Sequence, residues 1–288
     1  MHHAKPPEGS AIKALAIDLD GTALLPDTRL GERTADCLRR LLARGIQAII
    51  CTGRAPESAR GYCEAIGARG PMVFFNGAAV ADMPGCEPLR LGLVPLEVID
   101  YGLDVARGLG AHFQAWFPPG GPESGESRPG MRLVIEKPRP EADFYQKHTG
   151  TAAFVADIRR FAAEPGLAGA AKGMFITDPK LHGEIREKML ERFGERIYVS
   201  RTHPTFLEVM AAGVSKGEGL KTAAGLRGLD PAEIAAFGDE ENDLPMFAVA
   251  GFSAAPSNAR ESVKRAADFI FGSNAEEGLA AFLEDLFP

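Results

Sequence analysis

Two groups of carboxylates follow apolar runs at opposite ends of the chain. Asp18 and Asp20 stand two residues apart, with Gly21 directly after them. Alternate residues of an extended chain face opposite ways, so both acids reach one site only if the chain bends, which glycine permits. The second group, from Asp239 to Asp243, offers oxygen ligands of the kind that Mg²⁺ prefers. A turn and an acidic helix start are the structural alternatives for the two groups.

Two further segments could bind an anion. Thr52 and Gly53 follow another apolar run and offer a hydroxyl and backbone N–H groups near a helix start. Lys216 opens a predicted helix, where a cation is unfavourable by a few tenths to about 1 kcal/mol, so its placement favours an anionic ligand. The alternatives are a helix cap for Thr52 and an ordinary surface lysine for Lys216.

The elements around these residues alternate between strand and helix at both ends of the chain. This alternation indicates a doubly wound parallel sheet of the α/β class, in which the strands end at one edge and deliver their side chains there. The predicted strands are 14–18, 46–51, 71–75 and 234–237. The predicted helices are 28–44, 57–66, one from 216, one after 242 and one ending at 286.

The middle of the chain has a different texture and indicates an inserted domain. Its predicted helices are 96–109, 152–163 and 180–193, and its predicted strands are 112–117, 131–136, 174–177, 197–201 and 206–210, the last two forming a hairpin. The stretch 118–130 is rich in Pro, Gly, Ser and Glu, which predicts a loop. We therefore assign 1–82 and 201–288 to the core and 83–200 to an inserted α/β cap.

Composition narrows the class of protein. The 288 residues carry a net charge of −7, and the basic residues are scattered, which argues against a nucleic-acid surface. No run of about 18 apolar residues is present, and the first ten residues lack the layout of a secretory signal, so we expect no membrane association and a cytoplasmic location.

Taken together, these motifs and their order resemble the haloacid dehalogenase-like phosphatases, specifically the Cof-type group of subfamily IIB. The resemblance rests on the segments from Asp18 to Thr22, from Cys51 to Arg54, from Gly213 to Gly217 and from Gly238 to Asp243, with Asn76-Gly77-Ala78 similar to the turn before that group's cap. It implies a Rossmann-like core with an inserted α/β cap that selects the substrate.

The resemblance also implies roles for individual residues. Asp18 would be the nucleophile that forms an aspartyl phosphate, and Asp20 the general acid and base. Thr52 and Lys216 would bind the phosphoryl oxygens, with Gly53 and Asn242 as helpers. The metal site would comprise Asp18, Asp20 through its backbone carbonyl, Asp239 and Asp243, where Asp243 orients the lysine or a metal-bound water.

The implied activity is Mg²⁺-dependent hydrolysis of the phosphate monoester of a small metabolite, such as a sugar phosphate or cofactor phosphate. Two alternatives remain open: a phosphosugar mutase or phosphotransferase of the same superfamily, and a phospholigand-binding protein without turnover. Glu240 departs from the family pattern, which commonly has glycine there, and a charge at that position could alter the metal loop if it pointed inward.

Overall fold

The computed structural model describes residues 12–119 and 130–288, which form two compact units. Within these residues the first unit contains 12–55, 59–90 and 215–288, and the second contains 56–58, 91–119 and 130–214. The units therefore divide at 90/91 and 214/215, whereas the sequence placed the boundaries at 82/83 and 200/201. Strand pairing explains the difference. The residues that follow 82 pair with strands of the first unit, and the residues that follow 200 pair with strands of the second unit.

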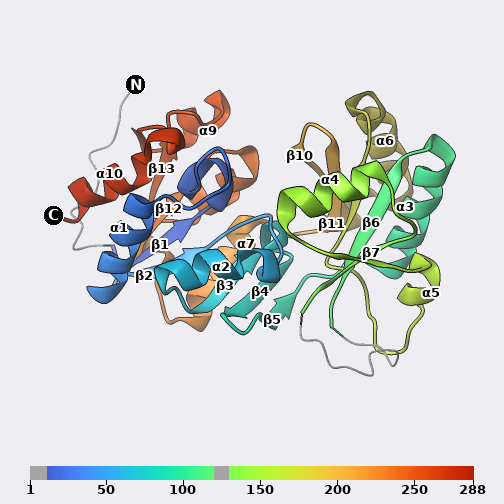
Figure 1. The fold of residues 1–288 in the computed structure, drawn as a ribbon, viewed down its shortest axis with the longest axis horizontal. Helices are drawn as coiled ribbons and strands as arrows, with labels where there is room; N and C mark the ends of the chain where they lie inside the picture. Colours follow the sequence, from blue (N-terminus) through green and yellow to red (C-terminus); the bar gives the residue numbers. More distant parts are fainter. Residues whose placement is uncertain (1–11, 120–129) are drawn as a thin grey trace. The chain divides into compact units, whose positions relative to one another are not determined.

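The first unit is built on five parallel strands in the order β14-β13-β12-β1-β2 (Figure 1). Their bounds are β1 Ala14–Ile17, β2 Gln47–Ile50, β12 Ile234–Phe237, β13 Phe252–Pro256 and β14 Phe269–Phe271. The residues of β1 and β12 are completely buried, as a parallel sheet covered by helices on both faces requires. The predicted parallel α/β core is confirmed, and β1 and β12 lie side by side in it.

Six helices accompany this sheet, and two of them show how distant segments meet. The helices are α1 Glu32–Ala43, α2 Pro56–Ile66, α7 Lys216–Leu226, α8 Leu244–Phe247, α9 Glu261–Ala266 and α10 Gly278–Leu286. Helix α1 packs on α10, where Arg33 and Arg40 form ion pairs with Glu284. Helix α7 packs against the strand that follows α2, and this contact fixes the start of α7 beside the sheet.

The predicted strand 71–75 does not continue the parallel sheet. It forms β3 (Gly70–Phe74), which pairs antiparallel with β4 (Ala79–Met83) in a three-stranded sheet completed by β5 (Glu87–Leu91). A single parallel bridge, from Cys51 to Val73, still joins β3 to the end of β2. The tight turn at 75–77 explains the antiparallel pairing, because it returns the chain directly alongside β3.

The second unit is an α/β domain with a six-stranded sheet in the order β10-β11-β9-β6-β7-β8. Its strands are β6 His112–Phe117, β7 Arg132–Ile135, β8 Ala153–Val155, β9 Lys172–Ile176, β10 Ile197–His203 and β11 Phe206–Ala211; its helices are α3 Leu96–Leu109, α4 Pro140–Thr149, α5 Ile158–Ala162 and α6 His182–Phe193. All strand pairs are antiparallel except β7 with β8. An inserted α/β domain with the expected hairpin is confirmed.

One predicted element of this domain is wrong. The helix expected over 152–163 is the strand β8 followed by the short helix α5, while α4 was not anticipated. The Gln146 side chain accepts a hydrogen bond from the Ala153 amide at 2.8 Å, and Asp157 caps α5, so local polar contacts split the segment. Most of the predicted loop 118–130 falls outside the described residues.

None of the helices within the described ranges is long and apolar enough to cross a membrane.

Candidate active site

Asp18 is the first residue beyond the buried strand β1. Its backbone amide donates to the Phe237 carbonyl at 3.0 Å, which extends the β1–β12 pairing to this point. The residue as a whole is 5% exposed. The chain then turns sharply through 19–23, so that the carboxylate lies at the edge where the parallel strands end.

Gly21 makes the bend that the sequence predicted, for a reason more specific than turn preference. Its φ is +79°, and a Cβ at this position would lie 2.2 Å from Oδ2 of Asp239. Any side chain would therefore displace the Asp239 carboxylate as well as strain the backbone. Thr22, which we did not predict as a site residue, donates its hydroxyl to Oδ1 of Asp239 at 2.9 Å.

Lys216 opens α7 and turns into the same edge. Its ammonium donates to Oδ1 of Asp18 and to Oδ1 of Asp243, each at 2.6 Å. The lysine is 1% exposed, so the surface-lysine alternative is excluded. Two carboxylates of the protein compensate for placing a cation at a helix N-terminus.

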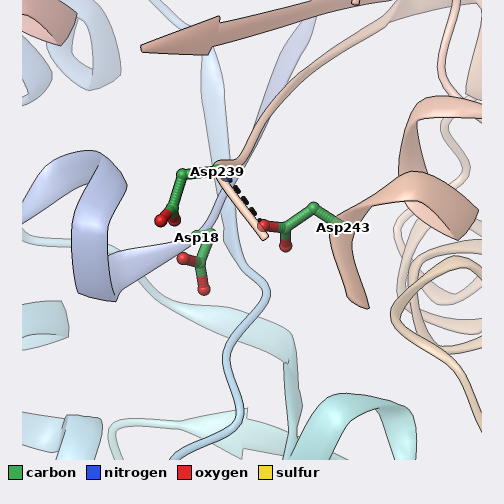
Figure 2. Close-up of side chains that lie close together, drawn as sticks. All are labelled: Asp18, Asp239 and Asp243. Carbon is green, nitrogen blue, oxygen red and sulfur yellow. Dashed lines mark hydrogen bonds between the residues drawn. The ribbon is translucent and has the colours of Figure 1, made fainter. Parts of the chain in front are cut away.

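Asp239 and Asp243 sit at the two ends of the loop that follows β12 (Figure 2). Oδ2 of Asp243 accepts hydrogen bonds from the backbone amides of Asp239 at 2.9 Å and Glu240 at 3.0 Å. Both Asp243 oxygens are thus occupied, one by the loop and one by Lys216. Asp243 therefore holds the lysine and the loop in place.

The charges of this cluster do not balance. Burial raises the pKa of the Asp18 carboxyl well above its ordinary value, with Lys216 opposing and Asp243 adding to the rise. Burial and the charge of Asp243 raise the pKa of Asp239 to about 7, against the hydrogen bond from Thr22. Burial alone would lower the pKa of Lys216, but Asp18 and Asp243 outweigh it and raise it. Three buried carboxylates facing one ammonium leave an excess of negative charge.

This excess of negative charge suits a divalent cation. Ligand atoms of Asp18, Asp239 and Asp243 lie within 4.8 Å of one another, and all three residues are buried. Two oxygens bound to one Mg²⁺ ion at about 2.1 Å each stand up to about 4 Å apart, so the cluster needs little adjustment to hold the ion. Asp18 and Asp239 are the better direct ligands, because both oxygens of Asp243 already accept hydrogen bonds.

Asn76, which we did not predict in this role, links Thr52, Gly53 and Asn242. The Thr52 carbonyl accepts from the Asn76 amide at 3.1 Å, and Asn76 Oδ1 accepts from Nδ2 of Asn242 at 2.9 Å. A Cβ on Gly53 would lie 3.0 Å from the same Asn76 oxygen. Asn76, in a left-handed conformation with φ of 55°, therefore connects the predicted phosphate-binding residues after β2 to the loop after β12.

Asp20 is not part of the buried cluster. Its side chain is 47% exposed and forms an ion pair with Arg54, whose side chain is 10% exposed. Glu240, the departure from the family pattern, has a side chain that is 48% exposed and paired with Arg260. The Glu240 side chain also accepts a hydrogen bond from the backbone amide of Asp243, and its charge makes only a minor contribution to the raised pKa of Asp239. Glu240 therefore caps the loop after β12 without entering the buried carboxylate cluster.

Comparisons with known proteins agree with this arrangement. The sequence profile of the haloacid dehalogenase-like hydrolases matches residues 15–283. A Haemophilus influenzae protein is 30% identical over 285 residues, 96% of this chain and 97% of that protein. The 5-amino-6-(5-phospho-D-ribitylamino)uracil phosphatase YitU of Bacillus subtilis is 27% identical over 280 residues, 95% of this chain and 97% of the relative. A haloacid dehalogenase-like hydrolase structure from Bacteroides thetaiotaomicron shares the fold, with a TM-score of 0.83 at 24% identity over 96% of this chain and all of its own.

Proposed function

This chain belongs to the haloacid dehalogenase-like hydrolases and is a phosphatase of that family, and we propose that it hydrolyses phosphate monoesters of small metabolites in a Mg²⁺-dependent reaction through an aspartyl phosphate. The observation that carries the proposal is the buried Asp18 carboxylate, held by Lys216 at 2.6 Å and accompanied by two further carboxylates. A purely structural ion pair would need one acid for one lysine, and this cluster has three.

In the first half of the proposed reaction, a carboxylate oxygen of Asp18 attacks phosphorus while the bond from phosphorus to the ester oxygen breaks. The departing oxygen takes a proton from Asp20, leaving an alcohol and an ionised Asp20. Lys216 and Thr52 bind the phosphoryl oxygens, and Asp243 keeps the ammonium in position through its 2.6 Å hydrogen bond.

In the second half, water attacks the phosphorus of the aspartyl phosphate and gives a proton to the Asp20 carboxylate. The bond from phosphorus to the Asp18 oxygen breaks, which releases inorganic phosphate and restores both aspartates. The cycle balances, because the proton that Asp20 gives to the alcohol is replaced from the water.

Asp18, Asp239 and the backbone carbonyl of Asp20 would hold the Mg²⁺ ion. When bound, the ion supplies positive charge between the carboxylate nucleophile and the anionic substrate, which otherwise repel each other. The imbalance of buried charge in the cluster supports this part of the proposal.

We propose a broader class of substrates than the single ester in the name of any one relative. The Bacillus subtilis relative is named for a phosphorylated ribitylaminouracil, so that ester belongs in a test panel beside sugar phosphates and pyridoxal phosphate. The second unit, as the inserted cap, would select among these leaving groups. No described feature favours the mutase alternative over hydrolysis.

The test is phosphate release from this panel, with and without Mg²⁺, for the wild type and Asp18→Asn. We expect Mg²⁺-dependent release that the substitution abolishes. Release that persists in Asp18→Asn would reject the nucleophile, and isomerisation of a sugar phosphate without free phosphate would indicate a mutase.

A further inference from the structure

The Arg54 guanidinium forms a bidentate pair of hydrogen bonds with the Asp20 carboxylate. Its Nε donates to Oδ2 at 2.7 Å and its Nη2 to Oδ1 at 2.6 Å. Planar bidentate pairing of this kind fixes the orientation of a carboxylate as well as its position. Without it, the half-exposed Asp20 side chain would be free to rotate among solvent-facing conformations.

Arg54 is itself held from a second side. Its Nη1 donates to the Tyr62 hydroxyl at 3.3 Å, and the guanidinium lies 5.2 Å from the centre of the Tyr62 ring. The Tyr62 hydroxyl donates in turn to the Thr28 carbonyl at 2.8 Å. The contacts from Thr28 through Tyr62, on helix α2, to Arg54 therefore hold the guanidinium in a fixed position within the first unit.

The backbone at Arg54 is also tied to the predicted phosphate-binding residue. Its amide donates to Oγ1 of Thr52 at 3.2 Å, and its carbonyl accepts from the Phe75 amide at 3.0 Å. Arg54 thus links the turn that carries Asp20, after β1, to the loop that carries Thr52, after β2. A fixed distance between these two loops is what an acid and a phosphate-binding residue acting on one ester would require.

We propose that Arg54, braced by Tyr62, is a positioning residue that sets the Asp20 side chain where it can exchange protons with the leaving oxygen and then with water. The inference rests on the proposed function and assigns roles to two residues outside it. The bidentate pair holds the Asp20 carboxyl group in one orientation, which serves both the proton transfer to the leaving oxygen and the later transfer from water. The Arg54 side chain contacts the Asp20 carboxyl group, and it acts on the proton transfers by orienting that group.

The test compares leaving groups that need an acid with one that does not. An alkyl phosphate accepted by the wild type requires protonation of its leaving oxygen, whereas p-nitrophenolate departs as an anion. The quantity measured is kcat/KM, which covers the steps through departure of the leaving group. For Arg54→Gln we expect a fall of about 10- to 100-fold with the alkyl phosphate and less than about 3-fold with p-nitrophenyl phosphate.

Matched variants separate positioning from folding or phosphate binding. Arg54→Lys, which keeps the charge but loses the bidentate pair, should recover only part of the loss, and Tyr62→Phe should show a smaller loss of the same selectivity. Arg29→Gln removes an exposed arginine that is paired with Asp27 in the neighbouring loop, and it should change neither substrate. In Asp20→Asn, adding Arg54→Gln should cause no further loss with the alkyl phosphate.

Equal losses with both substrates, no loss, or a loss additive with that of Asp20→Asn would each overturn the positioning role. The proposed function fails separately, by a different result: retention of activity toward p-nitrophenyl phosphate in Asp18→Asn.

Discussion

Replacing Lys216 with methionine should destabilise the metal-free protein strongly. Methionine has a similar length and no charge, so the substitution leaves the Asp18 and Asp243 carboxylates, each previously 2.6 Å from the ammonium, buried without their shared cation. Breaking a buried ion pair by removing one partner costs about 3–5 kcal/mol. That is a large fraction of the roughly 5–15 kcal/mol by which domains are stable.

The assay is urea unfolding in the presence of a chelator at neutral pH, followed by far-UV circular dichroism. Trp116, the single tryptophan, lies in the second unit, so its fluorescence would follow the other part of the molecule. Lys221→Met provides the control, because Lys221 lies on the same helix in an exposed pair with Glu218, worth about 0–1 kcal/mol.

Two further results should accompany the loss. Adding Asp243→Asn to Lys216→Met should recover stability, because one of the uncompensated charges is removed while the loop keeps an acceptor. The loss should also shrink at acidic pH, since burial raises the pKa of Asp18 and lets it take up a proton. A loss of under about 1 kcal/mol, comparable to the control, would refute the reasoning that the lysine neutralises buried acids.

Three other outcomes are expected. Gly21→Ala should weaken Mg²⁺ binding about 10-fold or more in calorimetric titration, because its Cβ would displace the Asp239 carboxylate; unchanged affinity would contradict the close approach. In metal-free protein, the pKa of Asp239 is raised to about 7, against about 4 in the unfolded chain, so the free energy of unfolding falls as pH rises through this window. For Asp239→Asn, the free energy of unfolding, measured by denaturation from pH 4 to 8, should fall less than for the wild type. Glu240→Gln should change kcat/KM by less than about 3-fold, because Glu240 is an exposed partner of Arg260; a larger change would show that its charge reaches the metal loop.

The part of the site that could be predicted from sequence lies at strand ends. Asp18 and Asp239 follow two apolar runs that become adjacent parallel strands, so their meeting at one edge is a consequence of topology. Lys216 was predicted from the cost of a cation at a helix start, although the structure shows that carboxylates of the protein meet that cost. These predictions depend on local pattern and on the shared direction of the strands.

The contacts that join loops could not be predicted in the same way. Arg54 pairs with Asp20 from 34 residues away, and nothing in the local sequence of either residue specifies the other. Asn76 was noted only as part of a turn, yet its left-handed backbone places its side chain against Asn242. Such contacts arise from tertiary packing of loops, which hydrophobic periodicity does not encode.

The same limit explains the two elements of the fold that were predicted wrongly. The segment 152–163 contains enough alanine to suggest a helix, but pairing of β8 with β7 and the capping of α5 by Asp157 override that propensity. Strand β3 was expected to extend the parallel sheet, and only the tight turn after it determines that it pairs with β4 instead.

The most direct test of the account is to trap the phosphoryl enzyme. The wild type, mixed with Mg²⁺ and a substrate from the panel, would be quenched in acid during turnover and its peptides analysed by mass spectrometry, with Asp18→Asn treated in parallel. We expect a phosphoryl group on Asp18 in the wild type and none in the variant. A phosphoryl group on another residue, or hydrolysis by Asp18→Asn at the wild-type rate, would contradict it.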